Sequence, residues 1–244
     1  MAATEKINNN FYHHLGKLWY EAKDDPVALL RAENKVKVPW IVRRLKRNSR
    51  VLDVGCGGGF LSNALALAGH EVTGVDLSED ALRIAHEYDR TKKVKYLTAD
   101  AYHLPFPDES FDAVSAMDFL EHVERPDEVI QEISRVLKKD GLFFYHTFNR
   151  HFFSWLIVIK LVEWLIPKTP KNMHVLKLFI RPQELKEFCL KASMKVKEQV
   201  GLRPVLRSIP WTRIFSGEVP STFSFKLTKS SFLSYMGMAK KVSN

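Results

Sequence analysis

Short apolar, β-branched runs alternate with helical patterns through the middle of the chain, from Ser49 to Thr147. The runs have the length of buried strands, and the segments between them repeat apolar residues every three to four positions, as helices do. Strands that alternate with helices at this spacing along the sequence predict an α/β fold whose parallel sheet is covered by helices on both faces. The predicted strands are 50–54, 71–76, 94–98, 111–115 and 141–147, and the predicted helices are 60–68, 78–86 and 126–138.

The segments on either side of this core follow other patterns. Residues 11–47 are aromatic at the start and basic at the end, and we expect them to be helical. Residues 152–167 form an apolar run interrupted by Ser154, Lys160 and Glu163. This run of 16 residues is shorter than the roughly 20 that a membrane-spanning helix needs. It fits a segment in a membrane interface, because tryptophans and lysines lie near its ends, and it fits a buried helix over the active site equally well. The two roles are compatible.

The chain after residue 193 returns to strand-like patterns. Strands are predicted over 194–200 and 232–240, with a loop-rich insertion between them over 201–231. The sequence therefore divides into an N-terminal helical segment, a core, an apolar and basic insertion, and C-terminal strands that complete the sheet. These four segments are 1–48, 49–147, 148–193 and 194–244.

Composition excludes several classes of protein. With 45% hydrophobic and 27% charged residues in 244, the chain is neither disordered nor fibrous. Its two cysteines, Cys56 and Cys189, cannot form a disulfide framework or a thiolate zinc site. The polar first ten residues do not resemble a secretory signal. We therefore expect a reducing, cytoplasmic location.

The net charge of +9 is distributed unevenly. Residues 1–150 contain 21 Lys and Arg against 23 Asp and Glu, whereas residues 151–244 contain 16 against 5. All of the positive excess thus lies in the C-terminal part. This asymmetry predicts an anionic partner, either a phosphate backbone or a membrane surface, and the alternative is a basic face that only aids solubility.

A glycine-rich loop, Asp53–Gly59, lies directly after a predicted strand and before a predicted helix. Glycines there allow a sharp turn and a close approach to a bound molecule. A dinucleotide fingerprint would need glycine at position 60, which is Phe60, and the carboxylate of Asp53 would repel a pyrophosphate. A cationic cofactor without phosphate, such as S-adenosylmethionine, fits better.

Acidic residues follow the next two strands in the same way. Asp76 ends the second strand, where a carboxylate can accept hydrogen bonds from ribose hydroxyls. Asp100 and Ala101 follow the third strand, where a polar side chain and a backbone N–H can bracket an adenine ring. Each aspartate alone could be a turn former or a helix cap, but their order at successive strand ends supports the same cofactor.

These residues, with Leu104–Phe106, resemble the class I S-adenosylmethionine-dependent methyltransferases. From about Leu29 to Leu202 the chain is also similar to the ubiquinone-biosynthesis O-methyltransferases, the polyprenyl dihydroxybenzoate and demethylubiquinol methylases. The segments that carry this resemblance are Leu52–Gly59, Met117–Val123, Asn149–Arg150 with Ser154–Trp155, and Phe179–Leu185.

The resemblance implies a Rossmann-like, doubly wound, seven-stranded and mostly parallel sheet with one antiparallel strand and an apolar helical insertion after the fifth strand. Lys37 stands where the family has an arginine, which keeps the charge and loses the bidentate fork. The expected cofactor contacts are Lys37, Asp53, Gly55, Gly57, Asp76, Leu77, Asp100, Ala101 and Met117.

Asp118, Glu121 and His122 follow the fourth strand. On a helical turn their spacing would place two carboxylates and an imidazole on one face, which suits either proton removal or a hard cation. The alternative is an exposed polar turn that caps the next helix. In the family a matching set of two glutamates and a histidine can hold Mg²⁺, so the resemblance implies both a catalytic role and a magnesium site for these three residues. His146, at the end of the fifth strand, is a second candidate base.

The resemblance implies O-methylation of a hydroxyl on the aromatic, catechol-like ring of a polyprenylated quinone precursor in ubiquinone biosynthesis. The apolar run and the basic C-terminal part predict peripheral contact with the inner face of an anionic membrane. Association with other biosynthetic enzymes is a further expectation. Two alternatives remain open: C- or N-methylation of another small or lipid-like acceptor, and a non-catalytic scaffold that binds S-adenosylmethionine. Nucleic acid is a poor fit as partner, because the apolar run is unsuited to following phosphates.

Overall fold

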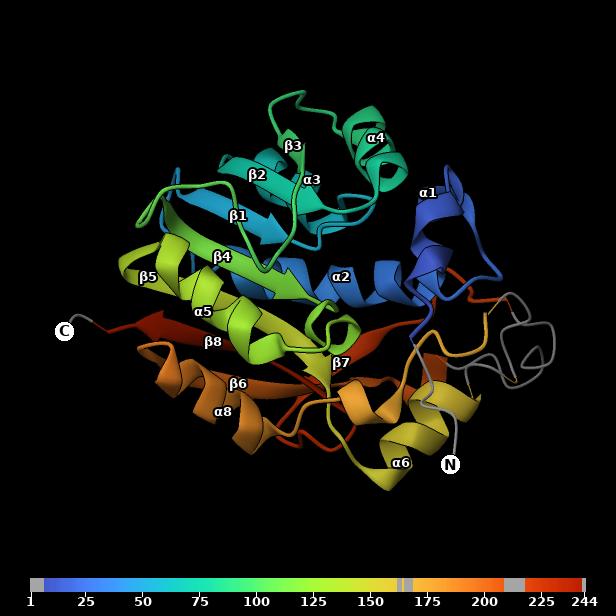
Figure 1. Cartoon of the computed structure of the whole chain (residues 1–244). Coiled ribbons are helices and arrows are strands. Elements are labelled where there is room, and N and C mark those ends of the chain that lie inside the picture. The colour runs from blue at the N-terminus through green and yellow to red at the C-terminus, as the bar shows by residue number, and fades with distance from the viewer. Residues whose placement is uncertain (1–6, 162–163, 165–168, 209–217, 243–244) are drawn as a thin grey trace.

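The computed structural model describes residues 7–161, 164, 169–208 and 218–242. They form one eight-stranded sheet in the order β3-β2-β1-β4-β5-β8-β6-β7 (Figure 1). Strands β1 to β5 pair in parallel, β8 lies antiparallel between β5 and β6, and β7 is antiparallel to β6. The bounds are β1 Arg50–Val54, β2 Glu71–Asp76, β3 Lys95–Thr98, β4 Phe111–Met117, β5 Leu137–Phe148, β6 Met194–Pro204, β7 Phe225–Thr228 and β8 Ser234–Lys241.

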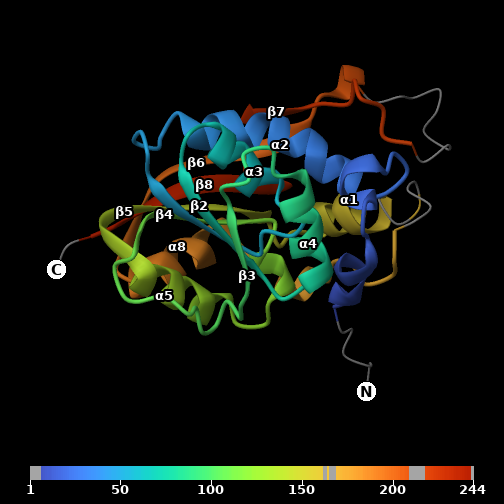
Figure 2. The same ribbon diagram turned by 90° about the horizontal axis from the view of Figure 1, so that it is seen from above.

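Helices cover both faces of the sheet, as Figure 2 shows from above. Helices α2 and α3 pack on one face, and α5 and α8 pack on the other. Successive side chains of β1 point to opposite faces of the sheet. Leu52 and Val54 belong to the apolar cluster under α5, and Val51 belongs to the cluster under α2. These helices are α2 Val27–Val42, α3 Phe60–Leu67, α4 Glu79–Tyr88, α5 Pro126–Val136 and α8 Pro182–Lys191.

The N-terminal segment lies beside the carboxyl ends of the central strands, on the right in Figure 1. Its side chains pack with α4 around Trp19. After β5, the chain forms the short α6 and a stretch of π-helix. Among the described residues, no helix is long and apolar enough to cross a membrane. The short elements are η1 Asn9–His14, α1 Leu18–Glu21, η2 Leu120–His122, α6 Phe152–Ser154, η3 Trp155–Leu161, η4 Leu176–Leu178 and η5 Leu206–Ser208.

The five strands and three helices predicted for the core are confirmed in kind and order. Ser78 caps α4, since its side chain accepts a hydrogen bond from the Ala81 N–H. Strand β5 begins at Leu137 rather than 141, because Leu137 pairs with Phe111 ahead of an irregularity in the β4 ladder. Helix α5 accordingly ends at Val136 instead of 138.

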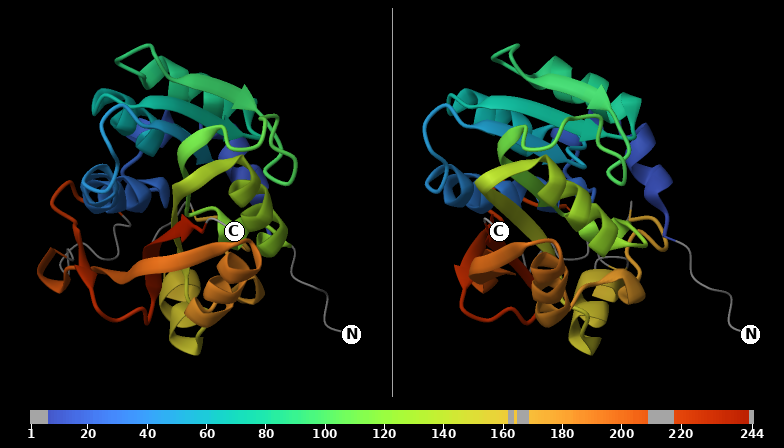
Figure 3. Two further views of the ribbon diagram at one scale, coloured as in Figure 1. Left: turned by 90° about the vertical axis from the view of Figure 1, so that its left-hand side faces the viewer. Right: turned by 60° about the vertical axis from the view of Figure 1, so that its left-hand side comes forward.

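The predicted α/β fold with a mostly parallel, Rossmann-like sheet is confirmed, and the described residues form eight strands where seven were predicted. The stretch 201–231, predicted to be a loop, contains β7, and β6 continues through it to Pro204. The backbone of Gly201–Pro204 pairs with β7, so the edge strand depends on a partner about 24 residues away in sequence. Figure 3 shows β6, β7 and β8, in orange and red, at the opposite end of the sheet from β3. Part of the same stretch, 209–217, lies outside the described residues, as do most of residues 162–168 of the predicted apolar run.

Candidate active site

A cavity of about 500 Å³ opens at the carboxyl ends of β1, β2 and β4. This is the edge at which open parallel sheets bind ligands, and the volume suits a small molecule. Its lining contains eight of the nine residues predicted to contact the cofactor: Asp53, Gly55, Gly57, Asp76, Leu77, Asp100, Ala101 and Met117.

The glycine-rich loop forms one wall of this cavity. The N–H groups of Gly55 and Cys56 both donate to the Val75 carbonyl, at 2.9 and 3.0 Å, which ties the loop to β2. Gly57 has φ +50°, and a Cβ there would lie 2.7 Å from the indole of Trp19. Glycine is therefore required at Gly57 both for its backbone conformation and for the approach of Trp19.

Two carboxylates from the carboxyl-terminal ends of β1 and β2 line the cavity. Buried Asp53 accepts hydrogen bonds from the hydroxyls of Ser62, at 2.6 Å, and Ser115, at 2.8 Å. Burial raises the pKa of Asp53 to about 6, although the hydroxyls oppose the shift. Asp76 accepts from the N–H groups of Gly57 and Ser78, both at 2.9 Å. Each Asp76 oxygen still has acceptor capacity for a ribose hydroxyl, and Asp53 supplies negative charge for a cationic cofactor. These residues fit S-adenosylmethionine.

The N-terminal segment covers the cavity, which the sequence interpretation did not foresee. Tyr12 stacks on Trp19 with ring centroids 5.8 Å apart, and it meets His122 edge-on at 5.4 Å. The density of aromatic residues over positions 11–20 was the available signal, because such side chains often anchor a segment to an apolar surface. The residues that line the cavity from this segment are Ile7, Asn9, Tyr12, His13 and Trp19.

The polar residues after β4 do not share a helical face as predicted. Asp118 has φ +56° and precedes the short η2, which contains both Glu121 and His122. Asp118 and His122 line the cavity, whereas Glu121 is fully buried and is not part of the lining. Burial and the nearby Asp118 raise the pKa of Glu121 to about 8, so its carboxyl group is mostly protonated at pH 7 and is a poor base there.

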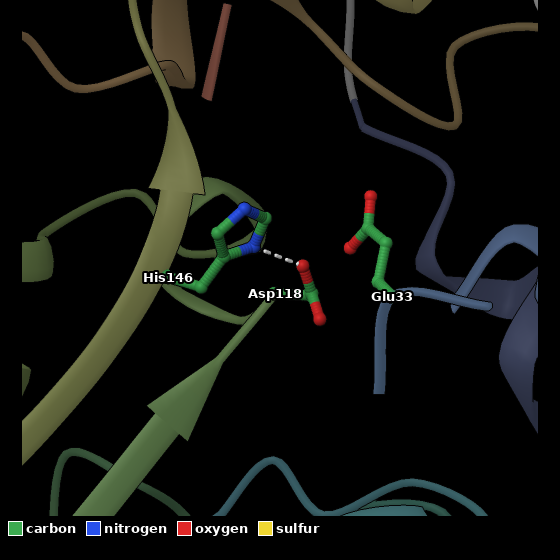
Figure 4. A group of neighbouring side chains, drawn as sticks. All are labelled: Glu33, Asp118 and His146. Carbon is green, nitrogen blue, oxygen red and sulfur yellow. Dashed lines mark hydrogen bonds and ion pairs between the residues drawn. The ribbon is translucent and has the colours of Figure 1, made fainter. Parts of the chain in front are cut away.

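Asp118 belongs instead to a buried ionic cluster with residues from α2 and β5. Its two oxygens accept hydrogen bonds from Lys37 Nζ at 2.7 and 2.6 Å, and Lys37 also bonds Glu33. The Nδ1 atom of His146 bonds Asp118 from the other side, and Figure 4 shows His146, Asp118 and Glu33 gathered around one point. Although burial opposes ionisation of Asp118, Lys37 and His146 hold its pKa well below the usual range.

Lys37 does not reach the predicted cofactor position. It is fully buried, does not line the cavity, and is bonded to two carboxylates. Burial lowers the pKa of its ammonium, but Asp118 and Glu33 more than offset this and raise it. The carboxylate clamp expected of Lys37 thus finds no support in this geometry.

The predicted magnesium ligands are not brought together either. Within the described part of the chain, the one group whose possible ligand atoms all lie within 4.8 Å of one another is Glu33, Asp118 and His146. Asp118 alone is common to this group and to the predicted Asp118, Glu121 and His122. Since an ammonium already bonds both carboxylates of the observed group, the arrangement does not fit a divalent cation.

His122 is held by the side-chain amide of Asn9. Asn9 Nδ2 donates to the His122 carbonyl at 3.1 Å, and Asn9 Oδ1 lies 3.1 Å from His122 Nδ1. Because Oδ1 can only accept, Nδ1 carries the proton and Nε2 keeps a lone pair. Enclosure in the site lowers the pKa of His122 to about 4. His122 is therefore a neutral imidazole at pH 7 with its lone pair on Nε2, although the same burial makes that nitrogen a weaker base than a free histidine.

Comparisons with known proteins agree with this geometry. A family model described as a methyltransferase domain matches residues 52–145. The chain is 37% identical over 196 residues to the ubiquinone biosynthesis O-methyltransferase of Pseudomonas putida, covering 78% of this chain and 84% of that protein. It is 37% identical over 212 residues to the protein of the same name from Hydrogenovibrio crunogenus, covering 84% and 87%. Magnesium protoporphyrin IX methyltransferase from Synechocystis, solved with bound SAH, has a similar fold, with a TM-score of 0.66 and 18% identity over 95% of this chain and 97% of that one.

Proposed function

The chain belongs to the ubiquinone biosynthesis O-methyltransferase family of S-adenosylmethionine-dependent methyltransferases, and from this premise we propose that it methylates a ring hydroxyl of a polyprenylated ubiquinone precursor. The observation that carries the proposal is the position of His122. A neutral imidazole with a free Nε2 lone pair lines the same cavity as the cofactor residues Gly55, Asp76 and Met117. A phenolic acceptor needs such a base, because its oxygen becomes strongly nucleophilic only as it loses its proton.

When bound, S-adenosylmethionine supplies a methyl group on a sulfonium for direct displacement by the acceptor oxygen. The protein then has two tasks, which are alignment and proton removal. Asp76 and the glycine-rich loop would hold the cofactor, and Asp53 would supply a negative charge for its cationic groups. His122 Nε2 would take the proton that the phenolic hydroxyl loses on methylation. The rings of Tyr12 and Trp19 shield the site from water.

The proposal is tested by incubating the purified protein with methyl-labelled S-adenosylmethionine and a solvent extract of membrane lipids. The expected product is a lipid-like quinol precursor with the label on a ring oxygen, identified by mass. His122→Gln should lower turnover by about 10²–10⁴ while leaving cofactor affinity nearly unchanged, since general-base catalysis is worth that much. Label on carbon or nitrogen would favour the alternative acceptors, and absence of turnover across quinol precursors would favour a scaffold.

We also propose that the protein meets its acceptor at an anionic membrane surface. An exposed aromatic patch, formed by Phe152, Phe153 and Phe232 with exposed fractions of 62, 47 and 44%, supports this contact. Phe153 lies within 5.6 Å of both other rings, measured between centroids. Water-exposed aromatic rings on a basic part of a protein are typical of interfacial segments. An acceptor with a long apolar tail would be stored in the same membrane.

A further inference from the structure

The buried cluster around Asp118 contains a cation supplied by the chain itself. Lys37 Nζ bonds both oxygens of Asp118 and one oxygen of Glu33, so each of its three N–H groups has an oxygen within reach. Its side chain has no exposed surface, and Glu33 and Asp118 are only 8 and 14% exposed. A buried ammonium held by several carboxylate oxygens is the arrangement that low-dielectric surroundings demand of a charged lysine.

The surrounding donors would suit a metal ion if the ammonium were absent. Glu33, Asp118 and His146 each offer a ligand atom, all within 4.8 Å of one another, and they come from α2, the end of β4 and β5. Two carboxylates and an imidazole are a common donor set for divalent ions such as Mn²⁺. An ammonium and a divalent ion bonded to the same oxygens would repel each other strongly in such a buried place.

We infer that the ammonium of Lys37 occupies the cation position of the Glu33, Asp118 and His146 site, so that this chain binds no divalent ion there and its reaction needs none at that point. Lys37 thereby neutralises Asp118 and holds it beside the cavity. The inference concerns ion binding and does not depend on which acceptor is methylated.

Titration of the full-length protein with Mn²⁺, followed by the paramagnetic resonance signal of the free ion, tests this inference. The wild type should show no Mn²⁺ binding that depends on His146. Lys37→Met should bind Mn²⁺ at least about 100-fold more tightly than the wild type, because the repelling charge is gone while the three donors remain. Adding His146→Phe to Lys37→Met should remove the gain. Lys35→Met, at an exposed lysine of the same helix, is the matched control and should behave as the wild type does.

Two results would overturn the inference. The first is Mn²⁺ binding by the wild type that Glu33→Gln or His146→Phe abolishes. The second is a Lys37→Met variant with wild-type circular dichroism that binds Mn²⁺ no better than the wild type. If Lys37→Met does not fold, the wild-type titration decides the matter by itself. Because the experiment measures metal binding, a result that contradicts this inference leaves the proposed O-methylation untouched, and the reverse also holds.

Discussion

At the scale of single residues, the proposed cofactor site contains carboxylates held in place by hydrogen bonds from the chain. Asp76 is the clearest case, since Gly57 and Ser78 each donate to one of its oxygens and fix the orientation of the group. A carboxylate fixed in this way can accept from ribose hydroxyls without first losing side-chain freedom. The energy of the contact then comes from charge-assisted hydrogen bonds.

Asp76→Ala should therefore weaken binding of S-adenosylhomocysteine by roughly 1.5–3 kcal/mol per lost hydrogen bond. Isothermal titration calorimetry measures this difference. Glu79→Ala, at the exposed first residue of the neighbouring α4, serves as the control and should bind normally. Equal affinity of Asp76→Ala and the wild type would remove Asp76 from the site.

The tautomer of His122 depends on a residue 113 positions away, because the amide of Asn9 fixes the proton on Nδ1. Asn9→Leu frees the ring to exchange tautomers and to rotate. We expect turnover to fall at least about tenfold, with little change in cofactor affinity, because the change acts on the base. Nitrogen NMR of the histidine ring should show the Nδ1–H tautomer in the wild type and a mixture in the variant.

Asn10→Leu provides the comparison, since Asn10 is the exposed neighbour in the same short helix. It should retain both the turnover and the ring signals of the wild type. An unchanged histidine spectrum in Asn9→Leu would mean that Asn9 does not position the base.

At the scale of elements, the N-terminal α1 covers the glycine-rich loop and forms part of the cavity wall. Trp19 is buried to 96% and lies over both Gly57 and Gly58, where any Cβ would collide with its ring. Because of this packing, the stability of the N-terminal segment is coupled to that of the glycine-rich loop. The cavity wall is thus formed by two elements that are separated in sequence by α2 and β1.

Trp19→Ala should lower the free energy of unfolding by about 3 kcal/mol, as removal of a buried indole usually does. It should also weaken S-adenosylhomocysteine binding, because the loop loses its cover. Denaturant unfolding and calorimetry report the two effects separately. Leu18→Ala, on the exposed side of the same helix, should change both by less than about 0.5 kcal/mol. A destabilised Trp19→Ala protein that keeps full affinity would restrict Trp19 to a structural role.

Some of the elements and contacts could be predicted from the sequence, and others could not. The core strands and helices were predictable because each has its own apolar period and its own end signals, such as Ser78 before α4. Strand β7 was not, since its four residues become a strand by pairing with β6. Asp118 was predicted to lie in a helical turn, but its backbone is in the left-handed region, and no local sequence pattern indicates this conformation. Its partner Lys37 lies 81 residues away, so their contact exists only in the folded chain.

At the scale of the whole molecule, charge and apolar surface are concentrated in the C-terminal part. Residues 151–244 contain all of the positive excess, with 16 Lys and Arg against 5 Asp and Glu. Most of the exposed aromatic patch of Phe152, Phe153 and Phe232 is contributed by α6, which follows β5 directly. An anionic membrane surface would satisfy both features together, because basic residues approach its headgroups while aromatic rings enter the interface.

The two features make separable contributions to membrane binding. Each suitably placed lysine or arginine contributes about 1 kcal/mol at an anionic surface, and salt screens that attraction. The aromatic rings contribute through burial of apolar area, which salt does not weaken. Sedimentation of the protein with vesicles should therefore be strong with phosphatidylglycerol at low salt, fall steeply as salt rises, and be weak with phosphatidylcholine alone.

Phe152→Glu should reduce membrane binding even at low salt, because it removes an aromatic anchor and adds repulsion. Leu67→Glu, at an equally exposed apolar residue of α3, adds the same charge elsewhere and should cost much less. Equal sedimentation with both kinds of vesicle, or with neither, would show that the aromatic patch and the basic residues serve some purpose other than docking on an anionic membrane.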